Sequence, residues 1–186
     1  MPNPLFSVVV FAWRPELLDR SVSAILNQTY KNLEIVIVDA YPAQDNIKVG
    51  QVITEMVQNY AKTDSRIRVL RMARFEQTRE EPLKNYEVTC RKALEIITGK
   101  YFLFQNDDDY IALDYVEKMV ALLEANPECT TAAGLPIAVD VNGKETDGPR
   151  VNNFRPKYMA GHEMVLDYTR GGKMFNSPGC SIFAFN

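Results

Sequence analysis

The sequence has few of the residues on which several common catalytic sites depend. Its 186 residues include one histidine, His162, and three cysteines that are far apart and form no Cys-x-x-Cys pair. A histidine-rich zinc site is therefore excluded, and a Ser-His-Asp triad is not favoured, because a lone histidine is more typical of a helix surface. Widely spaced cysteines are typical of ordinary reduced thiols in a reducing compartment.

Long apolar runs, a strong net charge and glycine-rich phosphate loops are also missing. No apolar stretch reaches the ~20 residues of a membrane span, and the amino terminus lacks the pattern of a signal peptide. We therefore expect a cytoplasmic protein, with the inner face of the membrane as the alternative place. The net charge of −3 gives no indication of a nucleic-acid partner. Neither Gly-x-Gly-x-x-Gly nor a P-loop follows the first apolar run, which argues against those nucleotide-binding folds.

What the sequence does contain is a regular alternation of apolar runs with amphipathic segments. The apolar, β-branched runs predict strands at 6–13, 33–39, 67–71 and 101–104. Helical spacing of apolar residues predicts helices at 15–29, 49–60, 84–97 and 115–125. We expect Gly99 to end the third of these helices and Asp114 to cap the fourth.

This alternation predicts an α/β fold. We expect a mostly parallel, doubly wound sheet with helices on both faces, in three α/β/α layers. Beyond residue 126 the pattern is weaker: 130–141 predicts a further strand, Asn142-Gly143 a turn that opens a hairpin, 161–168 a short helix and 180–185 a last strand. No repeat or linker divides the chain, so we expect a single domain over residues 1–186.

Three consecutive carboxylates follow the apolar run 101–104. Asp107, Asp108 and Asp109 would lie just past the carboxyl end of a buried strand, the edge at which open α/β sheets bind ligands. Adjacent carboxylates repel one another unless a cation or hydrogen-bond donors compensate. Their hard oxygen atoms suit Mg²⁺ or Mn²⁺, so one interpretation is a metal site that holds a diphosphate. A solvated acidic turn before a helix is the other, and the spacing alone does not decide between them.

A single acid, Asp39, ends the second predicted strand. If both strands belong to one parallel sheet, Asp39 shares an edge with the three carboxylates. Asp39 could then accept hydrogen bonds from a nucleobase or a ribose, although an acid that caps a loop is equally compatible with its position. Trp13 and Tyr41 follow strand ends and could stack on a base, with a partly buried aromatic residue as the alternative.

Several segments resemble the opening part of one enzyme family. They are Ser7–Val10, Pro15–Leu18, Ile25–Tyr30, Leu33–Asp39 and Ala93–Asp109. In this order they resemble the amino-terminal, donor-binding part of inverting family 2 glycosyltransferases, which have the GT-A fold. The likeness is most specific over residues 25–39 and is closest up to about residue 126.

The resemblance implies a transferase that moves a sugar from a nucleoside-diphosphate sugar to an acceptor hydroxyl with inversion. The donor would be of the UDP, GDP or dTDP type. Asp39 would contact its base, and the nucleotide-binding set would be completed by Phe11, Trp13, Tyr41 and Asp107.

The same resemblance places a DxD-type metal motif on residues 106–108. Asp108 would be the main ligand of Mn²⁺ or Mg²⁺, and Asp109 would support it. A divalent ion there would neutralise the charge that develops on the leaving diphosphate. The acceptor would be a glycan or a lipid-linked molecule, in the setting of bacterial surface polysaccharide biosynthesis.

The sequence also departs from the family pattern. Asn106 stands where the first acid of the metal motif is common, and Ala40 replaces a second aspartate. The family's catalytic base usually follows a strand such as 180–185, so we expect a domain that is truncated at its carboxyl end and assign the base to no residue here. Two alternatives stay open. One is a nucleotidyltransferase on a related fold, although the lack of glycine in residues 11–14 argues against it. The other is a non-catalytic sugar-nucleotide-binding or interaction module.

Overall fold

The computed structural model describes residues 3–39, 46–72, 82–134, 137–146, 160 and 181–184. Within them, six strands form one sheet in the order β3-β2-β1-β4-β6-β5. The strands are β1 (Phe6–Ala12), β2 (Leu33–Asp39), β3 (Ile67–Arg71), β4 (Tyr101–Asn106), β5 (Thr131–Ala133) and β6 (Ser181–Ala184). The pairs β1–β2, β1–β4 and β2–β3 are parallel, whereas β6 runs antiparallel to β4 and β5. The prediction of a mostly parallel α/β sheet is confirmed.

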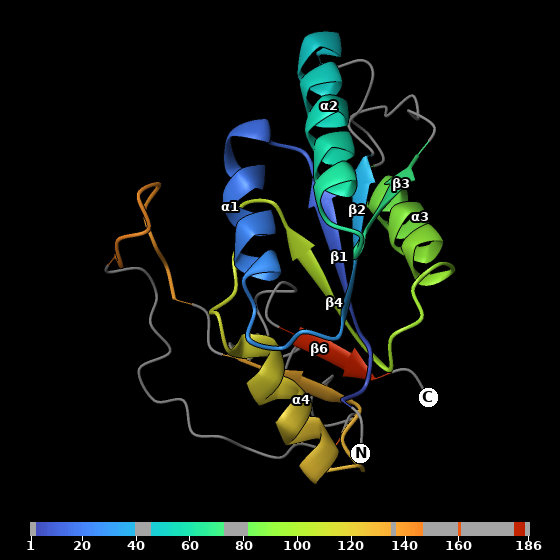
Figure 1. Ribbon diagram of the computed structural model, residues 1–186, viewed down its shortest axis with the longest axis vertical. Coiled ribbons are helices and arrows are strands. Elements are labelled where there is room, and N and C mark those ends of the chain that lie inside the picture. The colour runs from blue at the N-terminus through green and yellow to red at the C-terminus, as the bar shows by residue number, and fades with distance from the viewer. Residues whose placement is uncertain are drawn as a thin grey trace.

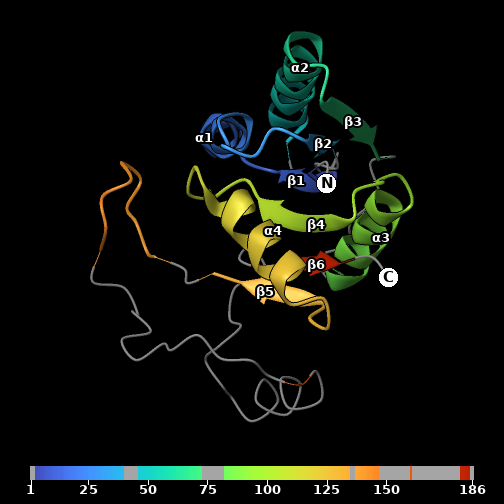
Figure 2. The ribbon, with the colours of Figure 1, turned by 60° about the horizontal axis from the view of Figure 1, so that its bottom comes forward.

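Helices cover both faces of this sheet. In the described part of the chain they are α1 (Pro15–Leu26), α2 (Ile47–Thr63), α3 (Pro82–Leu94) and α4 (Tyr115–Ala125). Helices α1, α2 and α4 share one apolar cluster with the sheet, and α3 packs against the opposite face. Figure 1 shows α1 and α2 on one side of the parallel strands and α3 on the other, and Figure 2 shows β6 and β5 continuing the sheet beyond β4. The three expected layers are therefore present.

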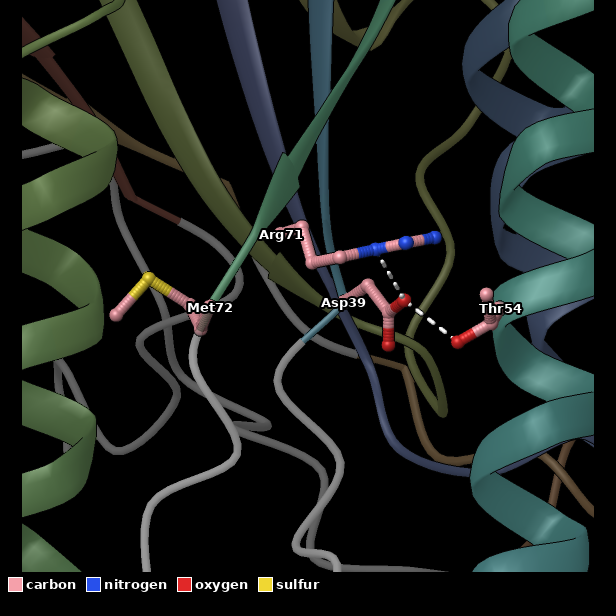
Figure 3. Close-up of a pocket in the computed structure, with 4 residues that line it drawn as sticks. All are labelled: Asp39, Thr54, Arg71 and Met72. Carbon is pink, nitrogen blue, oxygen red and sulfur yellow. Dashed lines mark hydrogen bonds and ion pairs between the residues drawn. The ribbon is translucent and has the colours of Figure 1, made fainter.

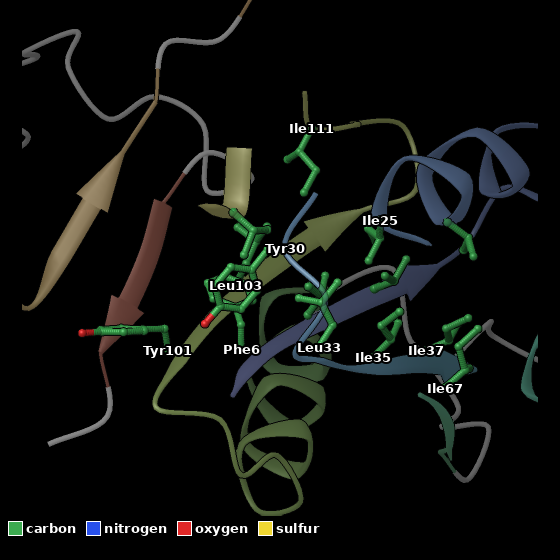
Figure 4. Close-up of a cluster of buried hydrophobic side chains, with 14 of the residues drawn as sticks. Phe6, Ile25, Tyr30, Leu33, Ile35, Ile37, Ile67, Tyr101, Leu103 and Ile111 are labelled. Carbon is green, nitrogen blue, oxygen red and sulfur yellow. The ribbon is translucent and has the colours of Figure 1, made fainter. Parts of the chain in front are cut away.

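Alternate residues of each strand face the two helical layers. In β1, Val8 and Val10 face the larger cluster, which α1, α2 and α4 cover, whereas Val9 and Phe11 face the smaller cluster beneath α3. Figure 4 shows the larger cluster, in which Ile25 of α1 lies over the aliphatic side chains of the sheet. Each fully buried aliphatic side chain contributes about 1.5–3 kcal/mol to folding. This two-sided burial explains why the central strands read as continuous apolar runs.

The amino-terminal ends of the strands are held together by the carboxylate of Glu34. It accepts hydrogen bonds from Ser7 Oγ (2.5 Å), from the N–H of Gly99 (2.9 Å) and from the N–H of Thr98, and Arg68 Nη2 lies 2.6 Å from it. Burial alone raises the pKa of Glu34, but these hydrogen bonds and the charge of Arg68 outweigh burial and lower the pKa. Glu34 therefore stays ionised in the folded protein and joins β1, β2 and the segment before β4.

The prediction that Gly99 ends a helix is wrong. Helix α3 ends at Leu94, five residues earlier. Gly99 instead lies where two backbones approach closely, because a Cβ atom added there would be 2.8 Å from Ser7 N and 2.9 Å from Leu5 O. The glycine is thus required by packing against the start of β1.

The prediction that Asp114 caps α4 is correct in position but wrong in mechanism. Asp114 precedes the helix, yet its side chain makes no capping hydrogen bond. Its carboxylate pairs with Lys118, with 2.6 Å between Oδ2 and Nζ. An i,i+4 ion pair across the first turn therefore replaces the expected cap.

The segment after α4 is more irregular than predicted. Only Thr131–Ala133 of the expected strand 130–141 is a strand in the described residues. The predicted hairpin turn is confirmed, since Val139 and Glu145 form an antiparallel bridge around Gly143, whose φ is +82°. The predicted helix 161–168 lies outside the described residues. No helix in the described ranges combines the length and the apolar character that crossing a membrane requires.

Candidate functional site

The pairing of the parallel strands brings their carboxyl ends to one edge. Ala12 at the end of β1 pairs with Asp39 of β2, and Asp39 pairs with Arg71 of β3. On the other side of β1, Phe11 pairs with Asn106, the last residue of β4. Asp39 and the carboxylates that follow Asn106 therefore flank the end of β1 on the same edge, as the parallel arrangement predicted.

Asp39 lines a cavity of about 300 Å³ together with Thr54, Arg71 and Met72 (Figure 3). The aspartate is 5% exposed. Thr54 Oγ1 donates a hydrogen bond of 2.7 Å to Asp39 Oδ2, and Arg71 Nε lies 3.6 Å from the same oxygen. Among the described residues both contacts fall on Oδ2, which leaves Oδ1 to accept a hydrogen bond from a bound molecule. The cavity thus offers an acceptor and a cationic donor next to each other.

Asp107 is buried and fully engaged by the connection between β1 and α1. Its Oδ2 accepts hydrogen bonds from the N–H of Trp13 and of Arg14, both at 2.5 Å. Its Oδ1 accepts from Arg14 Nε at 3.0 Å and from Arg14 Nη2 at 2.7 Å. The side chain is 0% exposed. Asp107 therefore fixes the loop after β1 to the end of β4 and has little capacity left for a ligand.

Asp108 and Asp109 are in a different position. Asp108 is 41% exposed and pairs with Arg14 Nη2 at 2.8 Å. The N–H of Asp109 donates to the carbonyl of Asn106, which closes the turn. Burial and, after it, the charge of Asp108 raise the pKa of the Asp109 carboxyl. A cation bound beside Asp108 would offset the repulsion between these two carboxylates.

The acidic turn suits a cation that brings further ligands with it. Among the described residues no group of three or more His, Cys, Asp or Glu side chains converges on one point, so a protein-only cage is not formed there. Mg²⁺ is commonly held by one or two carboxylates together with substrate phosphates. Asp108 and Asp109 fit this arrangement, because the Asp108 side chain is exposed and Asp109 follows it in the same turn. The residues present therefore fit a divalent ion that binds with a diphosphate.

The predicted aromatic residues differ in their surroundings. The Phe11 ring is buried, with its centroid 5.1 Å from that of Tyr86 and 5.7 Å from that of Phe104. Such a ring belongs to the core and does not reach a ligand. Trp13 is partly buried and packs against the same cluster. Tyr41 lies outside the described residues.

Three residues of this edge were missed in the sequence: Arg14, Thr54 and Arg71. Arg14 stands directly before the proline that begins α1, so it had to lie at the carboxyl edge beside the acids. Thr54 is a polar residue within the buried stripe of α2, which includes Ile53 and Val57. Arg71 ends a predicted strand, and this position also indicated that it lies at the carboxyl edge of the sheet. Pairing each of them with a particular acid required the strand order.

The sequence of this chain matches a known protein family. The model of the family described as Glycosyl transferase family 2 matches residues 7–186. A relative from Haemophilus influenzae, described as an uncharacterized glycosyltransferase, is 30% identical over 132 residues, which cover 68% of this chain and 35% of that protein. Relatives from H. influenzae and Bacillus subtilis are covered over 30% to 45% of their length. The chain thus spans less than half the length of the curated relatives it matches.

Solved structures show the same fold. The S. aureus protein TarS, residues 1–349 in complex with UDP-GlcNAc, superposes with a TM-score of 0.60 at 18% identity, covering 97% of this chain and 45% of that one. The mannosyltransferase PcManGT from Pyrobaculum calidifontis, in complex with GDP-Man and Mn²⁺, gives a TM-score of 0.53 at 18% identity, covering 70% and 35%. At these identities the likeness establishes the fold, which is GT-A. The family model matches residues 7–186, which is nearly the whole sequence, and this chain therefore belongs to glycosyl transferase family 2.

Proposed function

We propose that this chain binds a nucleoside-diphosphate sugar along the carboxyl edge of its sheet and serves in the transfer of the sugar to an acceptor hydroxyl. The observation that carries the proposal is the placement of the Asp39 cavity on one side of the end of β1 and of the exposed Asp108 with the half-buried Asp109 on the other. One end of this edge can hold a base and the other a diphosphate with its cation. The TarS and PcManGT complexes with UDP-GlcNAc and with GDP-Man and Mn²⁺ support this kind of donor.

At the base end, Asp39 Oδ1 would accept a hydrogen bond from an N–H of the base. Thr54 holds the other carboxylate oxygen, and Arg71 would donate to a carbonyl of the base. Uracil, thymine and guanine each present an N–H beside a carbonyl, so UDP, dTDP and GDP donors all fit this pair. Trp13, and Tyr41, which follows β2 in the sequence, stay proposed as stacking partners of the base.

At the diphosphate end, Asp108 and Asp109 would hold Mn²⁺ or Mg²⁺. The ion would supply positive charge to the departing nucleoside diphosphate. Arg14, which already contacts Asp107 and Asp108, lies where it can also neutralise phosphate oxygens. Asp107 acts indirectly, by fixing Arg14 and the loop after β1. With inversion, the acceptor hydroxyl attacks the anomeric carbon directly and its proton passes to a base, which we assign to no described residue.

The proposed acceptor is a glycan or a lipid-linked molecule, in surface polysaccharide biosynthesis at the inner face of the membrane. This part of the proposal is supported by the family alone. It predicts that the protein releases nucleoside diphosphate faster when membranes carrying lipid-linked glycans are added. An unchanged release rate would contradict it.

Thermal unfolding with UDP, GDP and dTDP, each with and without Mn²⁺, tests the donor site. A ligand at 100 times its Kd stabilises the folded state by about 2.7 kcal/mol. For a chain of this size that raises the melting temperature by roughly 5–10 °C. We expect one of the three nucleotides to give such a shift and Mn²⁺ to enlarge it. No shift with any of them would refute the donor site.

Asp108→Asn tests the cation assignment. It should remove the part of the shift that depends on Mn²⁺ and leave the rest. Glu128→Gln is the matched control, because it neutralises another exposed carboxylate, in the turn after α4, and should leave the whole shift intact. If the Mn²⁺-dependent part survives in Asp108→Asn, the assignment of the cation to Asp108 is wrong.

A non-catalytic sugar-nucleotide-binding module is the second candidate. The observation that favours it is the ion pair of 2.8 Å between Arg14 and Asp108, which already neutralises the expected metal ligand. Such a module would bind the nucleotide equally well with and without Mn²⁺. The two candidates can be distinguished by incubating the protein with the sugar nucleotide and measuring the nucleoside diphosphate released. Release above the background rate would eliminate the non-catalytic candidate.

A further inference from the structure

A fully buried glutamine, Gln105, lies at the carboxyl end of β4. It is 0% exposed. Tyr101 and Leu103, at alternate positions of the same strand, belong to the larger apolar cluster, so Gln105 points into the same layer toward α1. An apolar side chain of similar size would continue this pattern, and burial of an amide lowers stability unless all of its polar atoms are paired.

The amide of Gln105 joins helix α1 to the acidic turn. Its Nε2 donates to Ser21 Oγ at 2.7 Å and to the main-chain carbonyl of Asp109 at 3.1 Å. Ser21 Oγ in turn donates to the main-chain carbonyl of Asn106 at 3.3 Å. Both ends of the turn from Asn106 to Asp109 are therefore tied to one buried pair of side chains.

The pairing is incomplete in a way that stability alone does not explain. Gln105 Oε1 is a buried polar atom without a hydrogen-bond partner among the described residues. A second fully buried glutamine, Gln28, shows the contrast. Its Nε2 donates to the carbonyls of Ala24 (3.0 Å) and Ala112 (2.7 Å), and its Oε1 accepts from the N–H of Val116 (3.1 Å). Gln28 is fully paired and stabilises the fold, whereas Gln105 leaves half of its amide unpaired to hold one carbonyl of the turn.

The turn is thus held from two sides. Arg14 and the N–H of Trp13 hold the Asp107 side chain, and Gln105 and Ser21 hold the main chain. Between these attachments lie the side chains of Asp108, which is exposed and pairs with Arg14, and of Asp109, which is half-buried. A carboxylate binds a cation best when its backbone is fixed beforehand, because less order is then lost on binding.

We propose that Gln105 and Ser21 are positioning residues, which fix the backbone of the acidic turn so that Asp108 and Asp109 are preorganised for a divalent cation and a diphosphate. This inference rests on the proposed function for its ligand. The positioning itself is a property of the protein without ligand. The two can therefore be tested separately.

The experiment compares Gln105→Met and Ser21→Ala with the control Gln28→Met. Methionine has nearly the size of glutamine and removes the amide. Because Gln105→Met also removes the unpaired Oε1, we expect its melting temperature to stay within about 3 °C of the wild type. Gln28→Met should lower the melting temperature more, because it leaves the N–H of Val116 without its partner and removes one of the two hydrogen bonds to the carbonyl of Ala112.

The first readout needs no ligand. Hydrogen exchange of the Asp109 amide, measured by NMR on the metal-free protein, should become about tenfold faster in Gln105→Met and Ser21→Ala and stay unchanged in Gln28→Met. An unchanged exchange rate at Asp109 in both turn variants would overturn the positioning role. The same acceleration in Gln28→Met would overturn it too, since the effect would then reflect general loosening.

The second readout uses Mn²⁺ with whichever of UDP, GDP and dTDP binds the wild type best. The emission of Trp13, the single tryptophan of the chain, can follow the titration. Loss of a residue that orients metal ligands typically weakens metal affinity about 10–100-fold. We expect this loss of Mn²⁺-dependent affinity in both turn variants, with the Mn²⁺-independent affinity changed less than about twofold. Full Mn²⁺-dependent affinity in both turn variants would overturn the inference. If the wild type binds none of the nucleotides, the proposed function fails and the exchange rates still decide the positioning role.

Discussion

Asp107→Asn should destabilise the fold far more than Asp108→Asn, although both remove one charge from neighbouring residues. The Asp107 carboxylate accepts four hydrogen bonds, two from main-chain N–H groups and two from the Arg14 guanidinium, and its side chain is 0% exposed. An asparagine at this position can turn its oxygen toward the N–H groups only by turning its NH₂ toward the guanidinium. Two donors then face each other and both bonds to Arg14 are lost.

The magnitude follows from these contacts. Hydrogen bonds to charged groups contribute about 1.5–3 kcal/mol each. Arg14 is 43% exposed and can turn to water, so the two bonds to its guanidinium are discounted to about 1 kcal/mol together. The bonds from the N–H groups persist with a neutral acceptor at about half their strength, and the buried NH₂ remains unpaired. Together these losses amount to about 3.5–7 kcal/mol. Asp108 is 41% exposed with one ion pair, for which surface measurements suggest at most about 0.5–1 kcal/mol.

Urea unfolding followed by Trp13 emission and by circular dichroism measures both free energies of unfolding. A loss of about 3.5–7 kcal/mol would lower the melting temperature by roughly 7–28 °C for a chain of this size. Equal losses in the two variants would refute the reasoning, because they would show that burial and the main-chain donors do not distinguish Asp107. A loss below about 0.5 kcal/mol in Asp107→Asn would refute it as well.

Three further predictions concern other parts of the structure. The pKa of Glu34 is lower in the folded than in the unfolded state, so its ionisation stabilises the protein above the unfolded-state pKa. That stabilisation is lost as the pH falls through the folded-state pKa. The difference in unfolding free energy between wild type and Glu34→Gln, measured by urea titration, should therefore be largest near neutral pH and shrink below about pH 4.5. Gly99→Ala should lower the free energy of unfolding by about 1–3 kcal/mol, because its Cβ would press on main-chain atoms of Leu5 and Ser7, and a loss below about 0.5 kcal/mol would contradict this packing. Thr54→Val, which removes the hydroxyl that holds Asp39, should weaken nucleotide binding about fivefold in calorimetric titrations. Thr54→Ser keeps the hydroxyl and should retain wild-type affinity. Equal affinities of the two variants would show that Thr54 does not contribute to binding of the base.

Most of the fold was predictable because it depends on local patterns. The continuous apolar runs of β1, β2 and β4 indicated strands buried on both faces, and the helical stripes of α1 and α2 indicated the layer that covers them. Predictions failed where a residue's role depends on distant neighbours. Gly99 reads as the end of a helix in the sequence, and only the path of β1 beside it shows the close backbone approach.

The candidate site was predictable in outline and not in detail. Parallel strands end at one edge, so the acids at the ends of β2 and β4 had to lie on the same side of the sheet. Among the three consecutive carboxylates, however, the residue pattern does not separate Asp107 from Asp108, and only the family resemblance gave them different expected roles. The structure separates them, because one is buried under the loop after β1 and the other is exposed.

The sequence by itself determined the α/β alternation, the edge at which the acids gather and the likeness to family 2 glycosyltransferases, because strand and helix periods and short motifs are local properties of the chain. The tertiary structure alone decided which atoms meet at that edge. Arg14 and Asp107 are 93 positions apart, and Thr54 and Asp39 lie on different elements. Such contacts depend on strand order, register and burial, which decide that Asp107 is enclosed, that the Phe11 ring is part of the core and that Asp108 remains open to solvent.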